Sequence, residues 1–262
     1  MMPDSPSAVG VLGTRHIAGH LVERLARNPR RKVVLSPRNG QHARTFADQN
    51  TNVSVARDDA ALVSEVDVVL LATRASTGAD AIEGLPWHPA HTLVSLCAGL
   101  PMDALMFNAG AATLARAMPI SAAAIGESPT CLYPDVAAAR EVVEEFGPVH
   151  VLADEAQFDI ATVSAAFYGW VHSLIEEMAV WSANQGLPPG TARALVSQTV
   201  RAAAGMVIAQ PERSLPELLE ELCAPGGITE LGLQTLQDVR AFEYWQRASQ
   251  AVLDELRSAG DV

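Results

Sequence analysis

The sequence has few of the features that mark a secreted, nucleic-acid-binding or membrane-spanning protein. Its three cysteines lie far apart, so we expect neither a disulfide framework nor a metal site. The 18 Lys and Arg residues face 30 Asp and Glu, and a net charge of −12 argues against a nucleic-acid partner. No apolar run approaches the ~20 residues of a membrane helix, and the first seven residues do not look like a secretory signal. We therefore expect a cytoplasmic protein with no membrane segment.

Short apolar runs typical of strands alternate with helical stretches over the first half of the chain. We expect strands at residues 8–12, 32–36, 53–55, 66–72, 91–95, 113–118 and 149–152, with helices beginning near residues 16, 40, 59, 101 and 135. This alternation predicts an α/β fold, a Rossmann-like doubly wound parallel sheet with helices on both faces. The nearly continuous apolar run at 66–72 suits a strand buried on both faces.

After residue 153 the pattern is helical only. The expected helices span residues 155–184, 190–209, 214–223, 229–239 and 241–258. The first of them carries apolar residues on nearly all faces, more area than these few helices can bury alone. We therefore predict two domains, a dinucleotide-binding domain at 1–153 and an all-α dimerisation and substrate domain at 154–262, in a homodimer or higher homo-oligomer.

The first predicted strand runs into a turn of the kind that holds a dinucleotide pyrophosphate. In the fingerprint Gly-x-Gly-x-x-Gly/Ala, Gly13 and Ala18 fit the first and third positions, but Arg15 replaces the middle glycine. The N-terminus of the following helix attracts phosphate, and the Arg15 guanidinium can add to that attraction. A strand-to-helix turn without a ligand is the alternative. The cofactor contacts predicted here are Gly13, Thr14, Arg15, His16 and Ile17.

The second predicted strand ends at Ser36, with Arg38 two residues later. A site selective for NADH places Asp or Glu at this position to bind the ribose hydroxyls, whereas Ser36 with Arg38 suits the 2′-phosphate of NADPH. We therefore predict NADPH as the cofactor, with NADH as the second choice. The alternative for Arg38 is a solvated loop cation.

A Pro-Gly-Gly turn occupies residues 225–227, directly before a predicted helix that begins at Thr229. Such a turn exposes backbone N–H groups at a helix start, where a carboxylate can bind. A simple connection between two helices is the alternative reading.

Four other sets of polar residues are interpreted as structural. His16 and His20 are four residues apart, but no further ligand completes a metal site. His172 is interpreted as a buried core histidine. Two acidic sets are interpreted as solvated helix faces, namely Glu141, Glu144 and Glu145, and Glu217, Glu220 and Glu221.

In the order and spacing of several short motifs, the chain resembles pyrroline-5-carboxylate reductase over nearly its whole length. The matching stretches are residues 9–18, 70–74, 95–99, 115–119 and 225–229, together with 154–155, Asp159, Thr162, 186–187 and 198–199. The resemblance implies an NAD(P)H-dependent reduction of a cyclic imine, with the helical domains of two subunits interleaved. It adds Ala72, Thr73, Arg74 and Ala98 to the cofactor site.

The resemblance also implies roles for the Pro-Gly-Gly turn. The turn formed by Pro225, Gly226 and Gly227 holds the substrate carboxylate through backbone N–H groups, and the catalytic Thr229 hydroxyl faces the imine nitrogen. Departures from the family pattern are Arg15, Ile120, Phe167 and Tyr168, of which the two aromatic residues replace small ones near the substrate. We therefore expect pyrroline-5-carboxylate or a related imine as substrate.

Two alternatives to an imine reductase stay open. One is a non-catalytic NADP-binding regulatory relative. The other is a different Rossmann-type dehydrogenase, of a class that typically relies on a lysine in its helical domain. Residues 154–262 contain no lysine, which counts against the second alternative.

Overall fold

The computed structural model describes residues 8–13, 17–38 and 40–260, with the backbone alone for residues 259 and 260. It divides into two compact units. The α/β unit is Met1–Ala165 with Leu253–Val262, and the helical unit is Ala166–Val252. The domain boundary between residues 153 and 154 stays a prediction.

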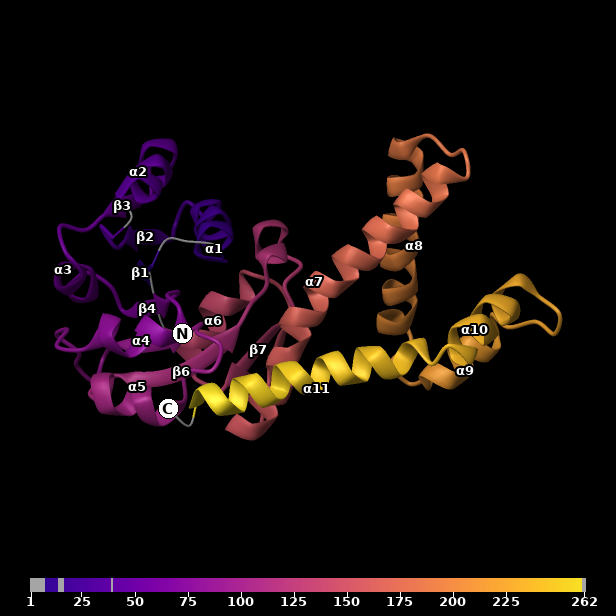
Figure 1. The fold of residues 1–262 in the computed structure, drawn as a ribbon. Helices are drawn as coiled ribbons and strands as arrows, with labels where there is room; N and C mark the ends of the chain where they lie inside the picture. Colours follow the sequence, from indigo (N-terminus) through magenta and orange to yellow (C-terminus); the bar gives the residue numbers. More distant parts are fainter. Residues whose placement is uncertain (1–7, 14–16, 39, 261–262) are drawn as a thin grey trace. The chain divides into compact units, whose positions relative to one another are not determined.

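The α/β unit is built on an eight-stranded sheet in the order β3-β2-β1-β4-β5-β6-β7-β8 (Figure 1). The strands are β1 (Ala8–Leu12), β2 (Lys32–Leu35), β3 (Val53–Val55), β4 (Val68–Leu71), β5 (Thr92–Ser95), β6 (Thr113–Met118), β7 (Thr130–Tyr133) and β8 (Val149–Val151). The first six run parallel, β7 is antiparallel to β6, and β8 is parallel to β7. The doubly wound sheet is confirmed. Strand β7 was not expected, and β8, which was expected to be parallel to the others, runs opposite to the first six strands.

Helices cover both faces of this sheet. They are α1 (Ile17–Ala26), α2 (Gly40–Gln49), α3 (Asp59–Ser64), α4 (Ala75–Ile82), α5 (Met102–Ala109), the 3₁₀ helix η1 (Ser121–Ile125) and α6 (Ala137–Glu144). Apolar residues of α1, α2, η1 and α6 form one core cluster, and those of α3, α4 and α5 form the other. Alternate residues of one strand enter opposite clusters, since Val11 of β1 belongs to the first and Leu12 to the second.

The order of the strands reverses at the centre of the sheet. Strand β1 pairs with β2 on one side and with β4 on the other, and all three are parallel. The connections from β1 and β4 therefore leave the sheet in opposite directions. A crevice of this kind, outside the carboxyl ends of the strands, is where open α/β sheets bind ligands.

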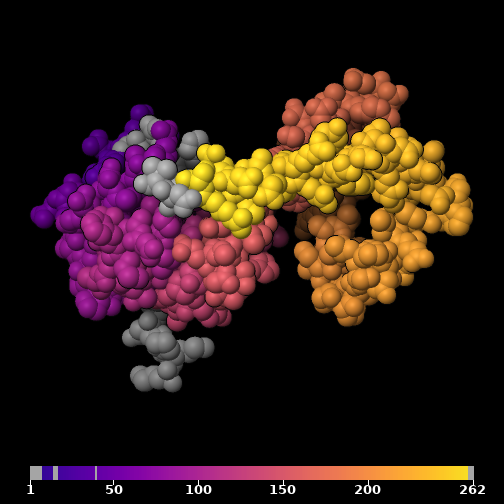
Figure 2. All heavy atoms as spheres, turned by 60° about the horizontal axis from the view of Figure 1, so that its bottom comes forward, coloured from indigo at the N-terminus to yellow at the C-terminus, as the bar shows by residue number. Residues whose placement is uncertain are grey.

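The helical elements that follow are α7 (Glu155–Asn184), α8 (Pro189–Ala209), α9 (Leu215–Glu220), α10 (Ile228–Asp238) and α11 (Ala241–Gly260). Across residues 166–252, all of which are described, Ala192 is the one apolar residue that is fully buried. Larger apolar side chains are exposed, including Ile208 at 78% and Ile228 at 91%. In Figure 2 the indigo and magenta atoms of the α/β unit are closely packed, whereas the orange segments leave open spaces. The helical unit thus lacks a core of its own.

The first turns of α7 are fixed to the sheet by a buried arginine. Arg116 of β6 is 2% exposed, and its guanidinium lies 2.6 Å from Glu155 Oε1 and 3.2 Å from Asp159 Oδ1. It also stacks over the Phe158 ring, 4.4 Å from the centroid. The Met102 N–H, at the start of α5, donates to the same Glu155 oxygen at 2.8 Å. Glu155 therefore joins β6, α5 and α7.

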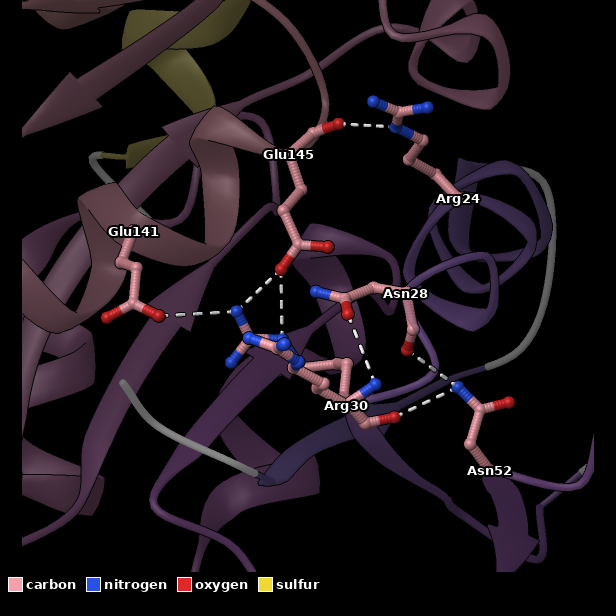
Figure 3. Close-up of polar contacts among 7 residues, drawn as sticks. Arg24, Asn28, Arg30, Asn52, Glu141 and Glu145 are labelled. Atoms are coloured by element: carbon pink, nitrogen blue, oxygen red, sulfur yellow. Dashed lines mark hydrogen bonds and ion pairs between the residues drawn. The ribbon is translucent and has the colours of Figure 1, made fainter. Parts of the chain in front are cut away.

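Two acidic residues of the α6 region belong to a partly buried ion-pair cluster, so the prediction of a solvated face was wrong for them. Glu145 and Glu141 accept hydrogen bonds from Arg31, with distances from the arginine Nη2 of 2.5 and 3.3 Å. Figure 3 labels Glu141 and Glu145 and draws the contacts of both carboxylates as dashed lines. Arg31 is only 5% exposed, and a buried cation needs such partners. Glu144 is exposed, as expected.

Asn52 holds the chain that leads into β2. Its Nδ2 group lies 3.1, 3.0 and 3.0 Å from the carbonyl oxygens of Ala26, Asn28 and Arg31. Figure 3 shows the contact between Asn52 and Asn28. These contacts fix the connection from α1 to β2, and with it the direction in which β2 enters the sheet.

Candidate functional site

The turn after β1 has a shape that only glycine accommodates. Gly13 has φ +94°, and a Cβ at this position would lie 2.6 Å from the Ala72 carbonyl oxygen and 2.9 Å from the Ala72 carbonyl carbon. Ile17 opens α1, and Ala18 is fully buried beneath it. The predicted contacts Thr14, Arg15 and His16 lie outside the described residues. The described part of the turn has the strand, glycine and helix that a pyrophosphate site needs.

The end of β2 holds a polar cluster of three residues. Ser36 is fully buried, and its hydroxyl donates to Asp59 Oδ1 at 2.6 Å. Arg38 donates its backbone N–H to Ser36 Oγ at 3.2 Å, and its Nε lies 2.7 Å from Asp59 Oδ2. The Arg38 side chain is 66% exposed, whereas Asp59 is 8% exposed. The Arg38 guanidinium is thus exposed at the surface, while the buried Ser36 hydroxyl accepts a hydrogen bond from the Arg38 backbone.

Asp59 is the polar residue of this cluster that sequence reasoning missed. The sequence predicts only a helix start at this residue, and Asp59 does begin α3, directly after the N-cap Asp58. The sequence signal that could have identified it is the pair of adjacent aspartates, Asp58 and Asp59. Asp58 caps α3 by accepting from the Ala61 N–H at 2.7 Å, so the second carboxylate had no role in the cap.

The ends of β4 and β5 adjoin the glycine turn. Gly13 faces Ala72 and the Thr73 methyl group, and the Cys97 thiol donates to the Thr73 carbonyl oxygen at 3.3 Å. Burial raises the pKa of the Cys97 thiol, which keeps it neutral and makes it an unsuitable nucleophile. Arg74 is exposed at the N-cap of α4, and Ala98 is exposed after Cys97. Gly13, Ala72 and Thr73 therefore meet at one edge of the sheet, beside Cys97.

The Pro-Gly-Gly turn lies in the helical unit and caps α10. Gly226 has φ +75°, and the Gly227 N–H donates to the Ala224 carbonyl oxygen at 2.8 Å. The Gly226 N–H donates to Glu230 Oε2 at 2.7 Å. Pro225 and Thr229 are exposed. The turn presents the predicted residues at a helix start, with one of its N–H groups bound by the chain's own carboxylate.

Aromatic residues in the helical unit pack against one another. Phe167 makes edge-to-face contacts with Trp170 and Trp245, with centroid distances of 6.2 and 5.7 Å. Tyr168 contacts His172 in the same way at 4.6 Å. His172 is exposed in the single chain, so its interpretation as a core residue was wrong. The Ile120 N–H, in the α/β unit, donates to Ser128 Oγ at 2.8 Å.

No helix within residues 17–38 and 40–260 is long and apolar enough to span a membrane. In the described part of the chain, no three His, Cys, Asp or Glu residues gather into a set that could hold a metal ion.

Two family models match the chain. Residues 155–258 match the model described as pyrroline-5-carboxylate reductase dimerisation, and residues 8–99 match the model described as NADP oxidoreductase, coenzyme F420-dependent. The two matches fall on either side of the sequence change near residue 153.

Curated relatives carry the same name. The chain is 31% identical over 252 residues to pyrroline-5-carboxylate reductase of Glycine max, which covers 90% of both proteins. It is 30% identical over 199 residues to pyrroline-5-carboxylate reductase 2 of Bacillus subtilis, which covers 72% of this chain and 71% of that protein.

Solved structures share the fold. The 1-pyrroline-5-carboxylate reductase of Streptococcus pyogenes aligns with a TM-score of 0.82 at 24% identity, covering 96% of this chain and 98% of the other. The Plasmodium falciparum pyrroline carboxylate reductase with NADP bound aligns with a TM-score of 0.82 at 20% identity, covering 97% and 98%. With relatives of about 30% identity across most of its length, the chain belongs to the pyrroline-5-carboxylate reductase family.

Proposed function

We propose that the protein uses NADPH to reduce the C=N bond of a cyclic imine, either pyrroline-5-carboxylate, which gives proline, or a related imine. The observation that carries this proposal is the glycine turn after β1. Gly13 adopts a conformation that excludes a side chain and lies against Ala72, at the point where open α/β sheets bind dinucleotides. The family membership supports the same activity.

The described residues at this edge fit a dinucleotide. A side chain on Gly13 would fill the space beside Ala72, and Arg38 offers an exposed cation at the end of β2. When bound, the reduced nicotinamide would supply a hydride. The proposed cofactor-binding residues are Gly13, Thr14, Arg15, His16, Ile17, Ser36, Arg38, Ala72, Thr73, Arg74 and Ala98.

The chain's own contribution to the reaction is to position the imine and hold one proton. In the proposed site, the turn formed by Pro225, Gly226 and Gly227 binds the substrate carboxylate, which takes the place of the Glu230 carboxylate at the Gly226 N–H. The Thr229 hydroxyl accepts a hydrogen bond from the protonated imine nitrogen, and this proton makes the imine carbon more electrophilic. Such a reaction depends on orientation more than on a strong base.

We further propose that the protein is a cytoplasmic homodimer. Residues 166–252 expose many large apolar side chains, and such surfaces mark sites of association. The match of residues 155–258 to a dimerisation model supports a homo-oligomer. Functionally, residues 1–153 hold the cofactor. Residues 154–262 form the dimer and carry the Pro225–Thr229 turn to the partner's cofactor.

The proposal is tested with purified protein, NADPH and a panel of cyclic imines that includes pyrroline-5-carboxylate. Imine-dependent loss of NADPH absorbance, or reduction of NADP with proline at high pH, is the expected result. If NADPH raises the melting temperature by ligand linkage and no imine is reduced, the protein is a non-catalytic relative. If NADPH neither binds nor reacts, the cofactor assignment fails as well.

A further inference from the structure

Asp59 is a carboxylate at the end of the sheet to which the family resemblance assigned no role. It lies at the start of α3 and is 8% exposed. Each of its oxygens has a different partner, because Oδ1 accepts from Ser36 Oγ at 2.6 Å and Oδ2 lies 2.7 Å from Arg38 Nε. Asp59 therefore contacts the residue that the proposed function assigns to the 2′-phosphate of NADPH.

The hydrogen bonds of Ser36 hold the Arg38 guanidinium and the Asp59 carboxylate next to each other. Ser36 is fully buried and accepts the Arg38 backbone N–H at 3.2 Å, so one hydroxyl links the aspartate to the loop that carries Arg38. If Arg38 swung away, a nearly buried carboxylate would lose its cation, which is unfavourable. Arg38 and Asp59 should thus stay together whether or not a nucleotide is bound.

The paired charges affect the two nicotinamide cofactors in opposite ways. A 2′-phosphate is attracted by Arg38 but repelled by the adjacent Asp59 carboxylate. A free ribose hydroxyl, as in NADH, can donate to a carboxylate, which is how acidic residues at this part of the fold select NADH. The neighbouring Arg57 and Asp58 are themselves paired at 3.3 Å, so they add no net charge to the region.

We propose that Asp59 is a specificity-determining residue that narrows the preference for NADPH and allows NADH to bind at the same site. This inference rests on the proposed function, because it concerns the same cofactor site. In this role the Asp59 carboxylate offsets part of the attraction between Arg38 and the 2′-phosphate. A residue that only stabilised the fold would leave the ratio of the NADPH and NADH affinities unchanged.

The test compares the dissociation constants of NADPH and NADH, measured from nicotinamide fluorescence, for wild type and Asp59→Asn. We expect the wild-type constants to lie within about tenfold of each other and the variant to shift the ratio toward NADPH by roughly tenfold. The control is Glu65→Gln, which removes one negative charge from the ion pair with Lys32, at the other end of β2. Its ratio should match that of wild type.

A second variant keeps the test decisive if Asp59→Asn does not fold. Arg38 is 66% exposed, and Ser36 still donates to Asp59 Oδ1 in its absence, so Arg38→Met should fold, with lower stability, while Asp59 faces the nucleotide alone. We expect NADPH to bind about 100-fold more weakly and NADH to bind within about threefold of wild type. Adding Asp59→Asn to this variant should bring the two constants close together.

Three results would overturn the inference. These are an unchanged ratio in Asp59→Asn, a shift toward NADH in that variant, or equal weakening of both nucleotides in Arg38→Met. If wild type binds neither nucleotide, the proposed function fails first. The two failures are therefore distinguishable in one set of titrations.

Discussion

Gly13 and Ala72 are in direct backbone contact at the carboxyl ends of β1 and β4. A Cβ on Gly13 would lie 2.6 Å from the Ala72 carbonyl oxygen, and the Ala72 N–H donates to the Leu12 carbonyl oxygen at 2.8 Å. The turn after β1 is therefore shaped by the neighbouring strand as well as by its own sequence. This contact places the proposed pyrophosphate site against the sheet.

Replacing Gly13 should disrupt nucleotide binding. In Gly13→Ala the new methyl group collides with Ala72, and φ +94° is unfavourable for alanine. We expect a loss of about 1–3 kcal/mol in the free energy of unfolding and NADPH binding weakened by about 100-fold or more. Thermal unfolding and fluorescence titration measure the two effects.

The matched control is Gly19→Ala in the helix that follows. A Cβ at Gly19 would meet the Phe46 ring at 3.7 Å, an ordinary contact, and alanine favours a helix. Its stability and its affinity should stay at or slightly above the wild-type values. Equal nucleotide binding by wild type and Gly13→Ala would contradict the placement of the site.

Glu155 should contribute more to stability than a surface carboxylate does. In Glu155→Ala, Arg116, which is 2% exposed, loses its 2.6 Å partner and the Met102 N–H loses its acceptor. We expect the free energy of unfolding to fall by about 2–3 kcal/mol. Glu23→Ala removes a surface pair with Arg27, in which both side chains are about half exposed, and should cost less than about 0.5 kcal/mol. Urea unfolding of both variants measures these losses. Equal losses of unfolding free energy would show that the contacts of Glu155 with Arg116 and Met102 add no more stability than a surface ion pair.

Stability should fall in mild acid because of His91. Burial lowers the pKa of this histidine below 6.5, the charge of His88 lowers it further, and Asp67 opposes the shift. The Nδ1 atom accepts the His88 N–H at 3.3 Å, which requires an unprotonated nitrogen. The contribution of His91 to stability is therefore present above the unfolded pKa and is lost as the pH falls through the folded one.

The measurement is the melting temperature of wild type and His91→Gln from about pH 7 to about pH 5. Wild type should lose more stability over this interval, because glutamine has no such titration. Parallel curves for the two proteins would show that His91 does not cause the acid sensitivity.

The protein should be an oligomer even when dilute. The exposed apolar side chains of the helical unit, such as Ile208 and Leu231, need cover that a second chain supplies. Light scattering at micromolar concentration should give at least twice the 27.7 kDa chain mass. A mass of one chain would mean that these surfaces stay open in solution and that the proposed shared site cannot form.

Much of the fold was predictable because its signals are local. The expected helix at residues 155–184 matches α7, since apolar spacing and the Gly-Leu-Pro stop are read directly from the sequence. Strand β7 was missed because its four residues lie between Pro129 and Pro134, which are typical of a loop. Helix α4 was missed because Ala-Ser-Thr-Gly is a weak helix sequence.

The site was predictable only where one segment determines it. Gly13 follows from the strand–turn–helix pattern around it. The roles of Asp59, Glu141 and Glu145 depend on residues that only folding brings near. Glu145 pairs with Arg31 across 114 positions, and Asp59 pairs with Ser36 across 23. No local pattern distinguishes such carboxylates from solvated ones.

The most direct test of the proposed function is single-turnover oxidation of enzyme-bound NADPH after addition of pyrroline-5-carboxylate or another cyclic imine. Rapid loss of the bound cofactor's absorbance, with one equivalent of the cyclic amine formed, is the expected result. The same experiment with Thr229→Val should be slower by about 10- to 100-fold, because the imine proton loses its contact. Bound NADPH that survives every imine in the panel would contradict the proposal that this chain is an imine reductase.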